Sequence, residues 1–165
     1  METAYYSSKL GLIKIEAVHQ TILSIQFVNS KSGHVILAKH ALDPDRGAGI
    51  HNGVLKKCVN QLDEYFKGKR KRFSLPLAKQ GTAFQQKVWS ALQKISFGST
   101  ESYAQIAQWV RNPKAMRAVG MANKKNPWVI VVPCHRVINK DGQLGGYACG
   151  QRKKGWLLKH ERSRS

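Results

Sequence analysis

The sequence predicts an α/β (α+β) fold in two domains: a strand-rich N-terminal domain over residues 1–79 and a mostly helical, winged-helix-like C-terminal domain over residues 80–165. Two observations support this prediction. Apolar residues recur near every second position at the N-terminal end, as in half-buried strands, whereas after residue 80 they recur with helical spacing. Hydrophobic residues make up 42% of the 165 residues, which is enough for one ample core or two small ones.

The N-terminal domain is predicted to contain strands over residues 10–18 (LGLIKIEAV) and 22–28 (ILSIQFV), followed by one helix. Segment 43–51 is rich in turn residues and is interpreted as a connector. Asn52 can cap the helix, and Gly68 lies past its end. The apolar face of this helix consists of Val54, Leu55, Cys58, Val59, Leu62 and Phe66.

Three helices are predicted at the start of the C-terminal domain. The motif TAFQ (82–85) is a capping box, and SYAQ (102–105) predicts a second box at the start of a short helix. Asn112 followed by Pro113 predicts the start of a third helix, which carries Arg117. Because only a short turn separates the last two helices, they predict a helix-turn-helix, a motif that many DNA-binding proteins use.

The rest of the domain is predicted to position a short apolar segment against a closing helix. Residues 128–132 (WVIVV), after the helix-ending Pro127, predict a fully buried strand. A glycine-rich loop follows over residues 142–146. A closing helix near residues 151–161 is expected to pack Trp156 and either Leu157 or Leu158 inward.

Charge is the strongest compositional signal. Lys and Arg number 28 against 9 Asp and Glu, so the formal net charge is +19 and the pI is near 10.2. Such a charge attracts polyanions, of which nucleic acid is the commonest, although a basic surface that serves only solubility is an alternative. The run Lys67 to Phe73 (KGKRKRF) could contact phosphate, but we interpret it as a solvated connector between the domains.

Three cysteines, with no CxxC pair, fit free thiols in a reducing, cytosolic setting. Cys58 belongs to the apolar helical face and is interpreted as a core residue. Cys134 differs, because it follows an apolar run and stands beside His135, and a neighbouring histidine favours the nucleophilic thiolate. From these two residues alone, a half-buried structural Cys-His pair is equally consistent with the sequence.

Several classes of protein are disfavoured. No apolar stretch is long enough to span a membrane, and the N-terminal METAYYSSKLGL lacks the features of a secretory signal, so a cytoplasmic protein is expected. His and Cys show no metal-ligand spacing, and neither a phosphate loop nor a dinucleotide fingerprint is present. The sequence therefore predicts no metal and no cofactor.

The segment from Thr82 to Glu161 closely resembles the O6-alkylguanine-DNA alkyltransferases, repair proteins that take an alkyl group from guanine onto their own cysteine. PCHRVI (133–138) is similar to the active-site signature of that family, and SYAQIAQWVRNPKAMRAVGMANKKNP (102–127) to its helix-turn-helix and Asn-containing hinge. FQQKVW (84–89) and GWLLKHE (155–161) match its flanking segments. The N-terminal half resembles the family only in general shape.

The resemblance implies direct repair of O6-alkylguanine by irreversible transfer of the alkyl group to Cys134, once per molecule, after the base has been flipped out of the duplex. The activity would be that of a methylated-DNA–protein-cysteine S-methyltransferase. His135 would act through a water as the base for Cys134, and Glu161 would orient His135. Asn126 would hold the hinge, and Tyr103 would donate its hydroxyl to guanine N3.

The resemblance also implies a base pocket. Val137 and Ala148 would read the base through their main chains, and Tyr147 would form a wall. The sequence YACG (147–150) departs from the more Gly-rich loop that is common in bacterial members. This departure puts the flexibility of the loop, and the range of bulky alkyl groups accepted, in doubt. Cys149 is interpreted as a bystander.

For DNA, the resemblance implies a recognition helix in the minor groove of duplex DNA that contains alkylated guanine, with Arg117 filling the space that the flipped base leaves. Small residues in the helix would allow close approach to the backbone. The predicted DNA-binding residues are Arg117, Ala118, Gly120, Met121, Lys124 and Lys125. A monomer is expected, and the sequence leaves open whether copies cluster along DNA.

Two other functions were weighed. A lesion-binding module of the same fold would flip the base without transferring anything, but such relatives lack the active-site cysteine, and Cys134 is present. A cysteine hydrolase using Cys134, His135 and Glu161 would explain the thiol but neither the charge of +19 nor the helix-turn-helix.

Overall fold

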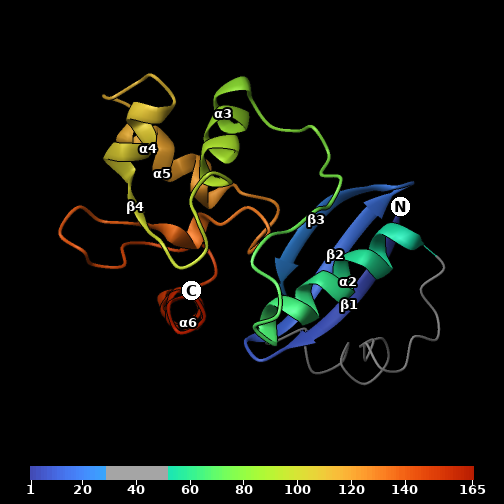
Figure 1. Ribbon diagram of the computed structural model, residues 1–165. Coiled ribbons are helices and arrows are strands. Elements are labelled where there is room, and N and C mark those ends of the chain that lie inside the picture. Colours follow the sequence, from blue (N-terminus) through green and yellow to red (C-terminus); the bar gives the residue numbers. More distant parts are fainter. Residues whose placement is uncertain (29–51) are drawn as a thin grey trace. The chain divides into compact units, whose positions relative to one another are not determined.

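The computed structural model describes residues 1–28 and 52–165, which fall into two compact units, Met1–Ala78 and Lys79–Ser165 (Figure 1). The first unit consists of strands and one long helix, and the second is mostly helical. The predicted fold class is therefore confirmed. The predicted connector over residues 43–51 lies outside the described residues.

The first unit is built on a three-stranded antiparallel sheet in the order β1-β2-β3, with β1 at Glu2–Ser8, β2 at Gly11–Val18 and β3 at Thr21–Phe27. Alternate side chains of the strands point into the core, where Ile13 and Ile15 are fully buried. The predicted strands over 10–18 and 22–28 are confirmed. Apolar residues alternate along them because one face of the antiparallel sheet is buried and the other faces solvent.

Helix α2 (Gly53–Phe66) contacts all three strands and covers one face of the sheet (Figure 1). The Asn52 side chain accepts the N–H bonds of Val54 and Leu55, as predicted for an N-cap. Cys58 is fully buried under this helix, and burial raises the pKa of its thiol to about 12. The prediction that Cys58 is a core residue is confirmed.

The second unit contains one short parallel pair of strands, β4 and β5, and its other elements are helical. Its elements are α3 (Ala83–Leu92), β4 (Glu101–Ser102), α4 (Tyr103–Trp109), α5 (Met116–Lys124), the short 3₁₀ helix η2 (Cys134–Arg136), β5 (Val137–Ile138) and α6 (Gln151–Arg162). Thr82 and Gln85 form the predicted capping box. Helices α4 and α5 pack against each other as the predicted helix pair.

Helix α5 begins later than predicted. Its first residue is Met116, and the residue before it, Ala115, makes no side-chain cap. The carbonyl of Asn112 accepts the Ala115 N–H at 3.0 Å, so these residues form a turn that leads into the helix. The prediction that Asn112 and Pro113 begin the helix is wrong, because a favourable N-cap sequence does not prevent the chain from making a tight turn first.

Residues 128–132 are buried, as predicted, but they do not form a strand. The segment folds into tight turns in which the Val132 N–H donates to the Trp128 carbonyl at 2.9 Å, and Ile130 adopts a positive φ of 71°. The Asn126 side chain spans the turns, accepting from the Trp128 N–H and donating to the Val132 carbonyl. A continuous apolar run reports burial, and periodicity alone cannot distinguish a strand from a buried turn.

Helix α6 confirms the predicted closing helix, with Leu157 and Leu158 buried against the core. Trp156, which was also expected to point inward, is half-buried and stacks on His160 with ring centroids 4.8 Å apart. Among residues 1–28 and 52–165, no helix is long and apolar enough to cross a membrane.

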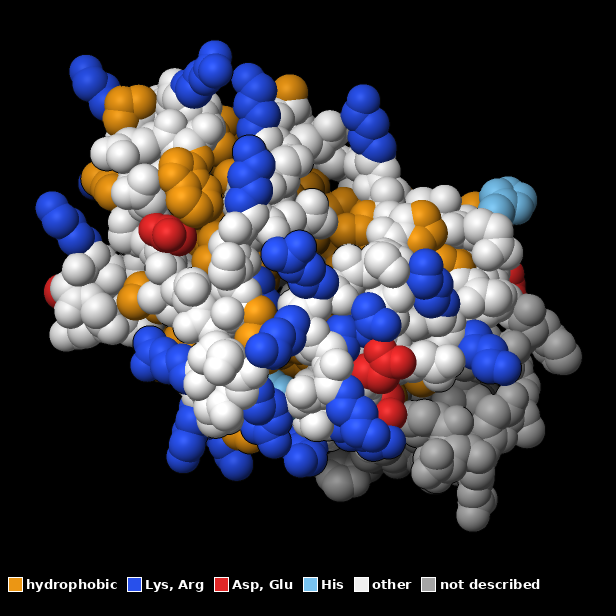
Figure 2. All heavy atoms as spheres, in the orientation of Figure 1, with side chains coloured by type: hydrophobic (Ala, Val, Ile, Leu, Met, Phe, Trp, Pro, Cys, Tyr) orange, Lys and Arg blue, Asp and Glu red, His pale blue; other side chains and the backbone are white. Residues whose placement is uncertain are grey.

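Positive charge is concentrated in the second unit. Residues 79–165 contain sixteen Lys and Arg but only three Asp and Glu, and one of these acids, Glu161, is fully buried. Figure 2 shows blue Lys and Arg side chains spread over the visible face, with red acidic groups at few places. The second unit therefore presents a strongly basic surface.

Candidate active site

Cys134 is the first residue of η2 and is only 4% exposed. It lines a pocket of about 200 Å³. The other residues that line this pocket are Tyr103, Gly120, Asn123, Lys124, Asn139, Gly146, Tyr147 and Ala148. The structure thus brings five predicted site residues, from α4, α5 and the loop before α6, to the same pocket as the cysteine.

A buried chain of three charged or titratable side chains lies next to the cysteine. His135 Nε2 and Glu161 Oε1 are 2.7 Å apart, and both side chains are fully buried. Arg136 grips the same carboxylate twice, through Nε at 2.8 Å and Nη2 at 3.1 Å, and its Nη1 donates to the Ile95 carbonyl at 2.6 Å. Bidentate pairs of this kind fix the orientation of a carboxylate.

The environment of these three side chains favours a neutral His135 beside an ionised Glu161. Burial lowers the pKa of His135 below its usual range, and the charges of Arg136 and Lys154 act in the same direction against the opposing effect of Glu161. Burial alone would raise the pKa of Glu161, but its hydrogen bonds to His135 and Arg136 outweigh burial and hold that pKa well below its usual range.

This arrangement makes His135 suitable as a base. A neutral ring that donates from Nε2 to Glu161 carries its lone pair on Nδ1. Nδ1 is buried and has no hydrogen-bond partner among the described residues. It is therefore available to take a proton, either directly or through a water.

Asn126 connects the turn over residues 128–132 to the cysteine. Its Nδ2 donates to Cys134 Sγ at 3.2 Å and to the Val132 carbonyl at 2.8 Å, while its Oδ1 accepts the Trp128 N–H at 2.9 Å. Burial raises the pKa of the Cys134 thiol to about 11, and the Asn126 hydrogen bond opposes this rise. Activation of the thiol therefore depends on groups that stabilise its charged form.

Tyr103, the first residue of α4, reaches across the pocket. Its hydroxyl lies 3.5 Å from the Gly146 carbonyl, and burial, followed by the field of Cys134, raises its pKa above the usual value. A tyrosine with a raised pKa stays protonated at neutral pH and can donate a hydrogen bond to a substrate.

The predicted DNA-binding residues and the buried residues of helix α5 lie on different sides of the helix. Its buried side is formed by Val119, Ala122 and Asn123. Arg117, Ala118, Met121, Lys124 and Lys125 are exposed, and Gly120 lies at the pocket. The exposed residues therefore occupy the solvent face of the helix, next to the pocket mouth.

Sequence reasoning missed two residues of this site, Arg136 and Lys154. Lys154 is fully buried, and its ammonium donates to the carbonyls of Val137 at 2.6 Å and Gly146 at 3.1 Å. A signal was present in the sequence, because Lys154 lies three, four and seven residues before Leu157, Leu158 and Glu161, on the same helical face.

Val137 and Cys149 are not among the residues that line the Cys134 pocket. Val137 is buried, and its carbonyl already accepts the Lys154 ammonium, so reading a base would use the second lone pair of that oxygen. Cys149 is half-buried in the loop beside Ala148, and burial raises the pKa of its thiol. Among residues 1–28 and 52–165, no group of three or more His, Cys, Asp or Glu side chains could hold a metal ion.

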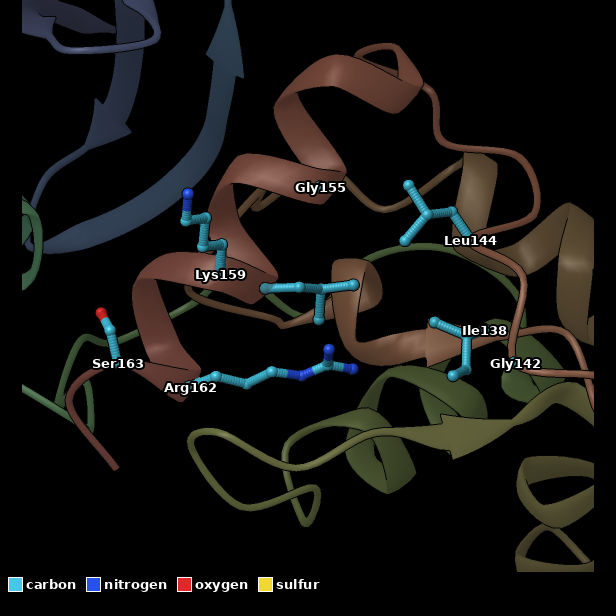
Figure 3. Close-up of a pocket in the computed structure, with 8 residues that line it drawn as sticks. Ile138, Gly142, Leu144, Gly155, Lys159, Arg162 and Ser163 are labelled. Carbon is cyan, nitrogen blue, oxygen red and sulfur yellow. The ribbon is translucent and has the colours of Figure 1, made fainter.

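A second, larger cavity of about 560 Å³ lies along α6 (Figure 3). Its lining residues are Ile138, Gly142, Leu144, Gly155, Leu158, Lys159, Arg162 and Ser163. None of the predicted site residues belongs to it. The chemistry described above is therefore confined to the smaller pocket that contains Cys134.

The buried Glu161 predicts a specific acid sensitivity. Its pKa is lower in the folded chain than the ordinary value of 4.5, so its stabilising effect is complete above that value and is lost as the pH falls below it. We expect the melting temperature of the wild-type protein to drop more steeply below about pH 4.5 than that of Glu161→Gln. Calorimetry across this range measures both slopes, and parallel slopes would contradict the assignment.

Comparison with known proteins gives consistent matches along the chain. The family description "6-O-methylguanine DNA methyltransferase, ribonuclease-like domain" matches residues 1–79, and "6-O-methylguanine DNA methyltransferase, DNA binding domain" matches residues 83–163. The methylated-DNA–protein-cysteine methyltransferase of Methanosarcina acetivorans is 40% identical over 164 residues, which cover 99% of each chain.

A relative from Bacillus subtilis, the constitutive methylated-DNA–protein-cysteine methyltransferase, is 56% identical over 109 residues, which span 66% of this chain and 66% of that protein. Among solved structures, Mycobacterium tuberculosis OGT in complex with DNA superimposes with a TM-score of 0.82 at 35% sequence identity. This superposition covers 100% of this chain and 95% of that one.

Proposed function

The chain belongs to the 6-O-methylguanine DNA methyltransferase family, and from that premise we propose that it repairs O6-alkylguanine in duplex DNA by moving the alkyl group onto Cys134. One observation carries the proposal most directly. Cys134 lines a pocket with Tyr103, while His135 beside it is held by a buried glutamate. A nucleophile, a base and a hydrogen-bond donor are thus assembled at one site.

The transfer is a single displacement. His135 accepts the thiol proton through a water at Nδ1, and the thiolate attacks the alkyl carbon in line with the bond to guanine O6. The C–S bond forms as the C–O6 bond breaks, and the electron pair of that bond passes to the guanine. Tyr103 donates to guanine N3, and the proton held by His135 returns to the base, so neutral guanine leaves.

The product explains why each molecule acts once. A thioether on Cys134 has no easy route back to a thiol, and the described residues that line the pocket include no second thiol. His135, Glu161 and Asn126 act on the cysteine, whereas Val137, Tyr147 and Ala148 would contact the base. The hydrogen bonds of His135 to Glu161 and of Asn126 to Cys134, and the presence of Tyr147 and Ala148 in the pocket lining, support these roles.

DNA is the partner that the basic surface favours. An alkyl group on a stacked base is out of reach, so the nucleotide must rotate into the pocket, and Arg117 on the exposed face of α5 fills the space that it leaves. Ala118, Gly120 and Met121 permit close approach in the minor groove, and Lys124 and Lys125 contact phosphate. Affinity should then fall steeply with salt.

The proposal also concerns the cofactor requirement, the location and the oligomeric state of the protein. The transfer needs no cofactor, because the alkyl group and its acceptor are both at hand. The protein would act as a cytoplasmic monomer on DNA. Sedimentation on DNA of increasing length tests whether copies cluster, since independent monomers give an affinity that does not depend on how many neighbours are bound.

Intact-protein mass spectrometry tests the function. After incubation with a duplex carrying one O6-methylguanine, we expect a gain of one methyl group per molecule, located on Cys134. Cys134→Ala should gain nothing, whereas Cys149→Ala, the matched control, should react like the wild type.

Two other results would overturn the proposal. Binding of the duplex without modification would favour a lesion-binding module. Repeated turnover with an unmodified cysteine would favour a hydrolase.

A further inference from the structure

Lys154 is an unusual residue for a protein interior. It lies on α6 and is fully buried, yet its ammonium has no ion-pair partner among the described residues. Its hydrogen bonds go to two neutral carbonyls, those of Val137 and Gly146. Burying a charge that is not paired with an opposite charge is costly, and a methionine or leucine would fill the same space without that cost.

The contacts of the ammonium join the two sides of the Cys134 pocket. Val137 begins β5, immediately after the helix η2 that carries Cys134, whereas Gly146 belongs to the loop that closes the pocket. The Tyr103 ring centroid, on α4, lies 6.0 Å from Nζ. One cation therefore ties a strand end to a loop and faces the tyrosine of the site.

Within residues 1–28 and 52–165, no other cation is placed to act on the thiol in this way. The Arg136 guanidinium is neutralised by Glu161 and also bound to the Ile95 carbonyl. Lys124 lines the pocket but is exposed, so water screens its charge. The fields of Lys154 and Cys134 act on each other: the lysine lowers the pKa of the thiol, and the thiolate raises that of the lysine.

We propose that Lys154 is a positioning residue with two roles: its ammonium stabilises the thiolate form of Cys134, and its two hydrogen bonds hold the loop carrying Gly146 against β5. The first role concerns any reaction of the thiol. Only its contribution to DNA repair rests on the function proposed above.

The proposal carries a pH dependence. Burial lowers the pKa of Lys154 to about 8, so the ammonium is progressively lost above that pH. The other titratable groups that face it are Cys134, Tyr103 and His135, from η2 and α4. Above about pH 8 the thiolate loses its counter-charge, so its stabilisation should weaken there instead of growing with pH.

Reaction with iodoacetamide tests the first role without any DNA. Carboxamidomethylation of Cys134 is followed against pH by peptide mass spectrometry in a Cys149→Ser background. In Lys154→Met we expect the alkylation rate at neutral pH to fall about tenfold, whereas well above pH 8, where the wild-type protein has itself lost the ammonium, the rates of the two proteins should converge. Lys154→Arg, which keeps the charge, should recover part of the rate. Lys159→Met, an exposed lysine of the same helix, should react like the wild type.

Limited trypsin digestion tests the second role. Lys140, Arg152 and Lys153 flank the loop and are sites for the protease. Cleavage there should be faster in Lys154→Met than in Lys159→Met. Lys154→Gln can still donate to the carbonyls, so it should protect the loop while the alkylation rate at neutral pH stays low, and it separates the two roles if the methionine variant folds poorly.

An unchanged alkylation rate at neutral pH in both the Gln and the Met variants would overturn the counter-charge role, and unchanged cleavage in the Met variant would overturn the loop restraint. The function is tested separately by methyl transfer from O6-methylguanine. If the wild-type protein fails to transfer methyl but the Lys154 variants still show the slower alkylation at neutral pH, the proposed function is refuted and the role of Lys154 is retained.

Discussion

Replacing Glu161 with Gln is expected to slow methyl transfer to Cys134 by about 10²–10⁴-fold, the range that general-base assistance contributes. Glutamine has nearly the same shape but no negative charge. It therefore neither stabilises the positive charge that forms on His135 nor neutralises Arg136. Single-turnover transfer, followed by mass spectrometry against time, measures the loss.

Stability should fall in the same variant, because a buried guanidinium is left without its carboxylate. Breaking a buried pair in this way costs about 3–5 kcal/mol of unfolding free energy. Glu101→Gln is the matched control, since Glu101 belongs to the same unit and is not part of the buried chain. A Glu161→Gln protein that transfers methyl at the wild-type rate would show that His135 does not act as the base.

Replacing Asn126 with Ala is expected to lower the unfolding free energy by about 2–6 kcal/mol, because the Trp128 N–H and the Val132 carbonyl lose buried partners at about 1–3 kcal/mol each. Loss of the bond to Sγ should also raise the pKa of Cys134 further above its ordinary value. Denaturant unfolding and the pH dependence of thiol alkylation measure the two effects.

Asn123 offers a control of the same residue type. It is about as buried as Asn126, at 8% against 5% exposed, but its Oδ1 has no hydrogen-bond partner among the described residues. Asn123→Ala should therefore cost less and leave the thiol pKa unchanged. Equal losses in the two variants would show that the Asn126 hydrogen bonds are not what holds the turn.

Local rules predicted much of the fold. Apolar alternation located β2 and β3, and capping residues located the starts of α2 and α3, because these signals act over a few neighbouring residues. The error at Asn112 arose because a local turn precedes the helix, and the error over residues 128–132 arose because a side chain from outside the segment holds its conformation. The Asn126 side chain reaches across the second segment, and no periodicity within that segment records this contact.

Some residues of the site could likewise be predicted from the sequence, and others could not. The PCHRVI motif drew attention to Cys134 and His135, and resemblance supplied Glu161 and Asn126, whose roles stay predictions. Lys154 was passed over because a lysine in the run RKK reads as a solvated residue of a basic helix. Only the docked position of α6 shows that this lysine is buried and that its two basic neighbours are not.

The location of Lys154 and Glu161 on α6 has a consequence for the order in which the protein is made. Cys134 is added to the chain before either residue, so until α6 has been made and has docked the cysteine has neither its proposed counter-charge nor the carboxylate held against His135. The hydrogen-bonded arrangement around the cysteine is therefore complete only when α6 docks.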